Sequence, residues 1–104
     1  MNPQYKKGVS ELCVLALLEK GNCYGYDISE RLSERIGIAD GTVYPILRKL
    51  KSDGLVDTYL QEESGGPPRK YYSLTKLGRE TYEADRAEYL KFADAIKNIL
   101  GGEV

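Results

Sequence analysis

The sequence contains no histidine and no tryptophan, and only two cysteines among its 104 residues. Without histidine, the chain lacks the commonest general base and cannot form a Ser-His or Cys-His nucleophile pair. Cys13 and Cys23 have no histidine partners for a zinc site and are too few for a disulfide framework. We interpret them as ordinary buried thiols, with a redox role as the alternative, and expect no metal, no cofactor and no enzymatic activity.

Long apolar segments are also missing. The longest apolar run, residues 12–18, is far shorter than the roughly 20 residues that cross a bilayer, and residues 1–7 lack the apolar core of a signal peptide. Hydrophobic residues make up 41% of the chain and charged residues 30%, which is typical of a folded globular protein. We therefore expect a compact cytoplasmic protein with no membrane partner.

A strong positive charge is absent too, since the net charge is -1 and the pI is about 5.5. Such values argue mildly against nucleic-acid binding, which usually requires a basic surface. Basic residues nevertheless gather locally, at Lys6 and Lys7, at Arg48, Lys49 and Lys51, and at Arg69 and Lys70. Acidic residues gather near the C-terminus, at Glu80, Glu83, Asp85 and Glu88. This distribution predicts a cationic face with an acidic back.

Two helices are predicted before residue 37. Residues 9–19 are apolar on nearly every side and precede Gly21, which indicates a buried first helix. The second helix is expected to start after Asn22, a candidate N-cap, and to end at Gly37. Its apolar residues recur every four positions, at Tyr24, Ile28, Leu32 and Ile36.

A third helix is predicted to begin at a cap, Asp40 or Thr42, and to end at Gly54, with Pro45 near its first turn. Its apolar residues follow the i, i+3, i+4, i+7 spacing of a buried stripe: Val43, Ile46, Leu47 and Leu50. Only residues 37–39 separate it from the second helix, a length typical of a helix-turn-helix.

After residue 54 the sequence pattern changes from helical spacing to that of a β-hairpin. Residues 55–61 and 69–74 have strand-like composition, and the Gly- and Pro-containing residues 63–68 between them indicate a turn. A three-helix core followed by one hairpin is the element order of a winged helix-turn-helix, in which the hairpin is the wing. We therefore expect a mainly α fold with a small β-hairpin.

The last segment predicts one long helix, capped by Thr75 and running to about residue 100. Its length of roughly 40 Å exceeds what so small a domain can cover. A heptad-like stripe, interrupted by Asp85, consists of Tyr82, Tyr89, Phe92, Ile96 and Ile99. We predict that this stripe joins two copies in a homodimer, the alternative being packing on the chain's own first helix. The expected division is a DNA-binding domain at 1–74 and a dimerisation helix at 75–104.

Double-stranded DNA is the predicted partner, because the third helix leaves polar and basic residues on its outer side. The candidate DNA contacts on this helix are Thr42, Tyr44, Pro45, Arg48 and Lys49. Arg69 and Lys70 lie at the return edge of the wing, where they can meet phosphates. Being adjacent in a strand, they should point to opposite faces. The alternatives are a solvated basic surface and a winged helix used for protein interaction.

Four blocks of this sequence resemble the PadR-like transcriptional regulators, specifically short members with a single C-terminal helix. These blocks are residues 8–18, the Tyr-Gly-Tyr-Asp-Ile of 24–28, the Gly-Thr-Val-Tyr-Pro-Ile-Leu of 41–47, and the Gly-Pro-Pro-Arg-Lys-Tyr-Tyr of 66–72 with 74–75 and 78–79. The resemblance implies a winged-helix dimer, usually a repressor, whose DNA affinity falls when an aromatic effector binds. It implies DNA contacts at Thr42, Tyr44, Pro45 and Arg48 of the third helix and at Arg69 and Lys70 of the wing. Tyr89 and Phe92 are the nearest substitutes for the tryptophan that lines an effector cleft in some relatives.

Overall fold

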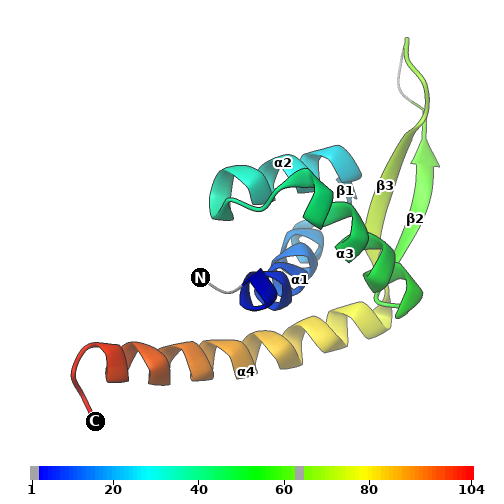
Figure 1. Ribbon diagram of the computed structural model, residues 1–104. Helices are drawn as coiled ribbons and strands as arrows, with labels where there is room; N and C mark the ends of the chain where they lie inside the picture. The colour runs from blue at the N-terminus through cyan, green and yellow to red at the C-terminus, as the bar shows by residue number, and fades with distance from the viewer. Residues whose placement is uncertain (1–2, 63–64) are drawn as a thin grey trace.

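The protein folds into helices packed on a small antiparallel sheet, as seen in a computed structural model that describes residues 3–62 and 65–104 (Figure 1). The order of the described elements is α1 (Pro3–Lys20), β1 (Cys23–Tyr24), α2 (Gly25–Ile36), α3 (Asp40–Ser52), β2 (Val56–Gln61), β3 (Arg69–Leu74) and α4 (Lys76–Leu100). The predicted fold is therefore confirmed: it is mainly helical, with a helix-turn-helix, a wing and a long C-terminal helix.

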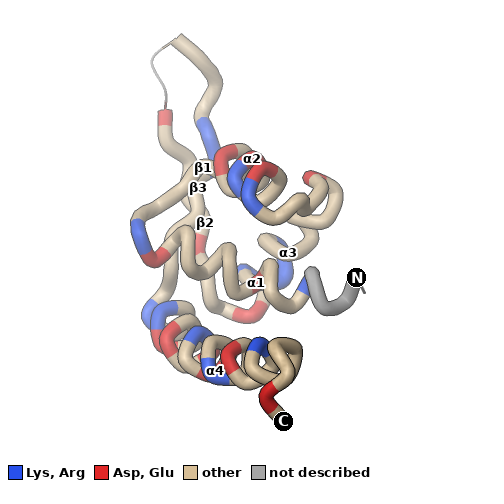
Figure 2. The backbone as a smooth tube through the Cα atoms, turned by 90° about the vertical axis from the view of Figure 1, so that its left-hand side faces the viewer, with Lys and Arg blue, Asp and Glu red and all other residues tan. Residues whose placement is uncertain are grey.

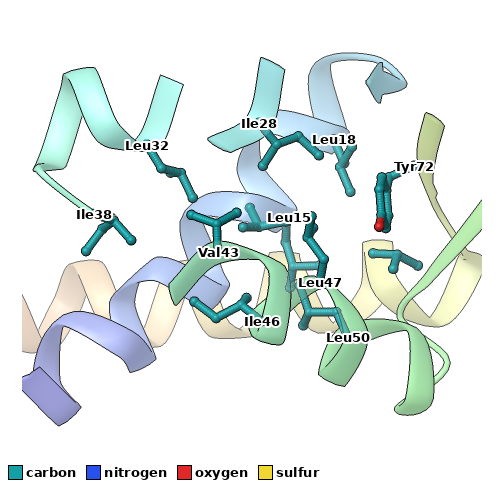
Figure 3. Packing of buried hydrophobic residues seen from close by; sticks show 12 residues of the cluster. Leu15, Leu18, Ile28, Leu32, Ile38, Val43, Ile46, Leu47, Leu50 and Tyr72 are labelled. Carbon is teal, nitrogen blue, oxygen red and sulfur yellow. The ribbon is translucent and has the colours of Figure 1, made fainter. Parts of the chain in front are cut away.

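The core lies between α1, α2 and α3 and is closed on one side by the sheet (Figure 3). Its buried hydrophobic residues are Val14, Leu15, Leu18, Ile28, Leu32, Ile38, Val43, Ile46, Leu47, Leu50, Val56 and Tyr72. The whole predicted stripe of the third helix is among them, with every member at most 1% exposed. Burying such side chains stabilises the fold by about 1.5–3 kcal/mol each. The rotation of α3 about its own axis is therefore strongly fixed.

The short connection between α2 and α3 is a helix C-cap followed by a buried anchor. Gly37 adopts a left-handed conformation, with φ of 68°, that glycine adopts readily because it has no Cβ. The N–H groups of Gly37 and Ile38 donate to the carbonyls of Ser33 and Leu32, at 3.1 and 3.3 Å. The buried side chain of Ile38 then holds the chain against the core before α3 begins at Asp40.

Several predicted helix starts are wrong. α1 begins at Pro3 rather than near residue 9. Asn22 does not cap α2, because residues 23–24 pair with the sheet and Tyr24 takes the N-cap position; the amide of Asn22 donates to the hydroxyl of Tyr59 instead, at 3.1 Å. α3 does begin at Asp40, one of the two predicted residues, but its N-cap is Ala39, with the N–H of Thr42 donating to the Ala39 carbonyl at 2.9 Å.

The predicted hairpin is present, but a third strand joins it. The strand order is β1-β3-β2, all antiparallel, with Tyr71 of β3 opposite both Tyr24 and Tyr59. Because side chains alternate along a strand, these three tyrosines share the face turned away from the core, while Tyr72 points inward and is 7% exposed. Of the predicted turn, residues 63 and 64 lie outside the described part of the chain.

The long helix α4 is fastened at its start and projects beyond the domain. As predicted, Thr75 is its N-cap: the Thr75 hydroxyl accepts from the N–H of Gly78 at 2.9 Å and donates to the carbonyl of Gly54 at 2.6 Å. α4 then runs beneath α1 (Figure 1), and the molecule measures 58 × 27 × 21 Å. Within the described residues, no helix is long and apolar enough to cross a membrane.

Candidate nucleic-acid interface

The outward side of α3 carries every helical residue predicted to contact DNA. Since the buried stripe fixes one side of the helix, the opposite side faces solvent. Thr42, Tyr44, Pro45, Arg48 and Lys49 are all exposed. Among the described residues, no carboxylate lies within salt-bridge distance of the Arg48 guanidinium, so this cation is available to an external anion.

Pro45 lies in the second turn of α3, just past the first turn near which the sequence placed it. Without an N–H group, Pro45 cannot close the helical hydrogen bond to the carbonyl of Gly41. Both residues are exposed, so water or a ligand can satisfy that carbonyl. The interruption therefore falls on the outer side of the helix, where it leaves one extra acceptor facing solvent.

Lys49 differs from Arg48 because its ammonium group is already paired. Its Nζ lies 3.2 Å from Asp53 and 3.5 Å from Glu11 of α1. The hydrogen bond to Asp53 and the nearby Glu11 carboxylate raise the pKa of Lys49. The side chain therefore lies on the flank of α3 that faces α1, away from the wing.

The two basic residues at the start of β3 lie against aromatic rings on opposite faces of the strand. The guanidinium carbon of Arg69 lies 4.9 Å from the centre of the Tyr24 ring, and the Lys70 Nζ lies 5.8 Å from that of Tyr72. Both distances are typical of cation–π contacts. Figure 2 shows this basic segment close to α2, so the base of the wing adds positive charge beside the helix-turn-helix.

A row of tyrosines that the sequence did not reveal covers the outer face of the sheet. The ring centres of Tyr59 and Tyr71 are 5.7 Å apart, those of Tyr71 and Tyr24 are 6.0 Å apart, and those of Tyr24 and Tyr26 are 6.1 Å apart. The prediction that Tyr24 belongs to the inward stripe of the second helix is wrong, because it lies in β1. Ile36, predicted on the same stripe, is 39% exposed.

Tyr44 connects this row to α3. Its ring carbon Cε1 lies 3.9 Å from the position that a Cβ on Gly25 would occupy, between Tyr24 and Tyr26 in the chain. Burial, followed by the negative charge of Asp40, raises the pKa of the Tyr44 hydroxyl. This hydroxyl is therefore a protonated donor at neutral pH.

The acidic residues predicted to form a back surface share α4 with basic residues. The acidic residues 80, 83, 85, 88 and 94 of α4 alternate with basic residues 76, 79, 86, 91 and 97. Figure 2 shows both signs interleaved along this helix. The charge of α4 is thus locally balanced, and one ion pair, Arg79 to Glu19 at 4.0 Å, ties the helix to α1.

The residues predicted to join two copies lie along α4 with unequal exposure. Tyr82 packs partly against the core of its own chain, and Tyr89 is half-buried. Phe92, Ile96 and Ile99 are exposed, with Phe92 reaching 58%. The second half of α4 therefore presents apolar side chains that its own chain does not cover.

A hollow of about 390 Å³ lies between α1, the end of α3 and α4. Tyr89 and Phe92, the residues predicted for an effector cleft, both line it, together with Glu11 and Glu88. Lys49 and Leu50 of α3 line the same hollow, so its contents would touch α3.

The two cysteines are half-buried free thiols. Burial raises the pKa of both, and the Cys23 thiol donates to the carbonyl of Gly21 at 3.4 Å. A raised pKa lowers the thiolate fraction and with it the reactivity. In residues 3–62 and 65–104, no three His, Cys, Asp or Glu side chains gather to hold a metal ion.

Comparison with known proteins agrees with this architecture. Residues 14–84 match the transcriptional regulator PadR-like family. The chain is 30% identical over 76 residues to the negative transcriptional regulator PadR of Bacillus subtilis, an alignment that covers 69% of this chain and 42% of that protein.

Solved structures of similar size also match. A PadR-like transcription factor from Bacteroides fragilis is 37% identical, with a TM-score of 0.76 and coverage of 92% of this chain and 94% of that one. A PadR-like transcriptional regulator from Bacillus cereus is 31% identical, with a TM-score of 0.84 and coverage of 93% and 96%. The similarity therefore extends over nearly the whole chain, including α4.

Proposed function

Because the chain belongs to the PadR-like family of transcriptional regulators, we propose that it binds operator DNA as a homodimer and represses transcription there. The observation that carries this proposal is the orientation of α3: its buried stripe turns the polar and basic side toward solvent, beside the wing. A helix so presented fits the major groove of B-form DNA.

Each exposed residue of this surface has a role that its chemistry suits. Thr42 and Tyr44 donate to base edges or phosphates, and Arg48 contacts guanine or phosphate. Pro45 packs against the groove. Lys49 contributes to neutralising the DNA backbone less than an unpaired cation would, because Asp53 and Glu11 already pair with it. Arg69 and Lys70 of the wing meet phosphates beside the groove.

Dimer formation is proposed through α4. Its uncovered apolar side needs a partner, and a second copy offers the same surface in a symmetric interface. We accordingly divide the chain into a DNA-binding domain at 1–74 and a dimerisation helix at 75–104. Two recognition helices then read an inverted repeat whose half-sites are about 34 Å apart. Because the net charge of each chain is -1 and not strongly positive, the affinity of one subunit for DNA should be modest. Tight binding should depend on joining two half-sites.

A small aromatic effector is proposed to release the protein from DNA. The hollow beside α4 supports this, because Tyr89 and Phe92 offer ring surfaces and α3 forms part of its wall. A molecule bound there can change the position of the recognition helix directly. In a gel shift, an effector should reduce the bound fraction of wild-type protein, while a Phe92→Ala variant should require a higher concentration.

DNA binding is tested by selecting duplexes from a random pool with the purified protein and footprinting the enriched sequence. The proposal expects protection of two half-sites and an affinity that falls steeply with salt, which reports neutralised phosphates. A folded protein that enriches no sequence and binds no duplex at low salt would favour the alternative, a winged helix that binds another protein.

Repression is tested separately. A reporter gene placed behind the selected operator should be transcribed less when the protein is present, whereas increased transcription would make it an activator. The proposal places the protein in the cytoplasm, with the DNA that it regulates.

A further inference from the structure

Three tyrosines from three different elements meet at the start of α2: Tyr24 of β1, Tyr26 of α2 and Tyr44 of α3. We call them the tyrosine cluster. Gly25 lies between Tyr24 and Tyr26 in the chain, and a Cβ there would lie 3.9 Å from the Tyr44 ring, which is an ordinary contact distance, and 3.0 Å from the Tyr72 ring, which is tight. Tyr26 is 55% exposed and Tyr44 is 39% exposed, so this cluster faces solvent although its members pack closely.

The tyrosine cluster also reaches the wing. The guanidinium group of Arg69 lies over the ring of Tyr24, and Figure 1 places β1 and the start of α2 at the base of the wing beside β3. The helix-turn-helix and the wing are thus connected by one continuous surface, made of three phenols and one guanidinium group.

The position of this surface matters because of the geometry of a DNA duplex. When α3 lies in a major groove and the wing approaches the neighbouring minor groove, the phosphate strand that separates the two grooves runs between the two elements. The tyrosine cluster and Arg69 lie between α3 and the wing, where this strand would run. Phenol hydroxyls and guanidinium groups are both donors to phosphate oxygens.

We propose, resting on the proposed DNA-binding function, that the tyrosine cluster and Arg69 clamp the phosphate strand between the two grooves. Tyr26 donates its hydroxyl to a phosphate, as does Tyr44. Tyr24 is a positioning residue: its ring supports Arg69 and orients the guanidinium toward the same strand. The contact reads no bases, so it strengthens binding to every duplex by the same factor.

The charges around this surface explain why phenols suit it. Asp27 follows Tyr26 in α2, and Asp40 begins α3, so carboxylates flank the tyrosine cluster. Ser29 donates a hydrogen bond to Asp40, which occupies one carboxylate oxygen. A neutral donor reaches a phosphate there without forming an ion pair with these carboxylates. A tyrosine hydroxyl is protonated at neutral pH and can donate there.

The test compares Tyr26→Phe with Tyr59→Phe, using one selected operator duplex and a scrambled duplex of equal length. Tyr59 is the matched control, since it is an exposed tyrosine of the same row that lies outside the tyrosine cluster and whose hydroxyl accepts an exposed hydrogen bond from Asn22. Tyr26→Phe should weaken binding to both duplexes by the same factor, about tenfold, while Tyr59→Phe leaves both affinities unchanged. Phenylalanine keeps the ring contact with Tyr24, so the fold is retained.

The positioning role of Tyr24 is tested through Arg69. Arg69→Gln should lower the salt slope of binding by about one per subunit. Tyr24→Leu should reproduce that loss, and Tyr24→Phe, which restores a ring beneath the guanidinium, should recover the salt slope. Circular dichroism checks that each variant is folded.

Two results would overturn the clamp while leaving the proposed function intact. In the first, wild-type protein binds the operator, and Tyr26→Phe binds each duplex as tightly as the wild type does. In the second, Tyr59→Phe lowers the affinity for both duplexes as much as Tyr26→Phe does. Wild-type protein that binds neither duplex would overturn the proposed function and the clamp together.

Discussion

Ser29 on α2 donates a hydrogen bond to the carboxylate of Asp40 on α3, with 2.5 Å between Oγ and Oδ1. Ser29 is 2% exposed, so this bond is the polar counterpart of the apolar packing between the two helices. It links the helix-turn-helix directly across residues 37–39. The angle between α2 and α3 therefore depends on a side-chain contact as well as on the core.

Ser29→Ala should lower the free energy of unfolding by about 1–2 kcal/mol, because it removes a buried donor and leaves Asp40 without its partner. Urea unfolding followed by circular dichroism measures this change. Ser33→Ala is the matched control on the same helix, since Ser33 is exposed and only its backbone carbonyl is used. Equal stability of the two variants would show that the bond does not stabilise the helix pair.

Gly78→Ala should destabilise the protein by about 3 kcal/mol or more, since a Cβ at this position would lie 1.9 Å from the carbonyl oxygen of Leu55. The start of α4 would have to move away from the end of the helix-turn-helix. Gly41→Ala offers the comparison: nothing lies within 4 Å of a Cβ there, so alanine should stabilise the helix by about 0.5–1 kcal/mol. Thermal unfolding of both variants would reveal opposite signs.

The sequence predicted those parts of the fold that depend on a repeated pattern. The buried stripe of α3 follows helical spacing without interruption, so the spacing alone was enough to place Val43, Ile46, Leu47 and Leu50 in the core. β1 could not be predicted, because a strand of two residues has no period and forms only through pairing with β3.

The candidate site also has one part that follows from a repeated sequence pattern and one part that does not. The outward side of α3 follows from its buried side, whereas the tyrosine cluster brings together β1, α2 and α3, which no local pattern reports. Asn22 illustrates the difference. Its residue type favours an N-cap, but in the folded chain its side-chain amide donates a hydrogen bond to the Tyr59 hydroxyl.

Arg48→Ala should weaken operator binding by about tenfold or more, because a base or phosphate contact is lost. Lys49→Ala should weaken it much less, since the Lys49 ammonium is already neutralised by Asp53 and Glu11. Fluorescence anisotropy with a labelled operator compares the two neighbouring variants at one salt concentration. Equal losses would mean that Lys49 leaves its carboxylate partners when DNA binds.

The raised pKa of the two thiols predicts that the protein loses stability at alkaline pH. Burial raises the pKa of Cys13 and Cys23 in the folded protein, while the unfolded chain ionises near the usual value of about 8.5. Their contribution is therefore fully present below about pH 8.5 and is lost as pH rises through the folded pKa. The free energy of unfolding of the wild type should fall as the pH rises above about 8.5, and that of a Cys13→Ala, Cys23→Ala double variant should fall less. Parallel curves would exclude the thiols as the cause.

The second half of α4 gives the sharpest test of dimer formation, because its apolar residues lie on more than one side. Phe92 belongs to the predicted stripe, whereas Leu90 follows Tyr89 by one residue and so points about 100° away from it. Both side chains are exposed, at 58% and 47%, so neither substitution disturbs the core.

In a symmetric dimer, Phe92→Asp removes two buried rings, which should weaken association by about 100-fold or more. Leu90→Asp changes the charge of α4 equally but should leave the dimer intact. Sedimentation equilibrium measures both, and circular dichroism verifies that each variant is folded. If Leu90→Asp dissociates the protein and Phe92→Asp does not, the interface lies on the other side of α4, and the hollow lined by Tyr89 and Phe92 stays open to solvent in the dimer.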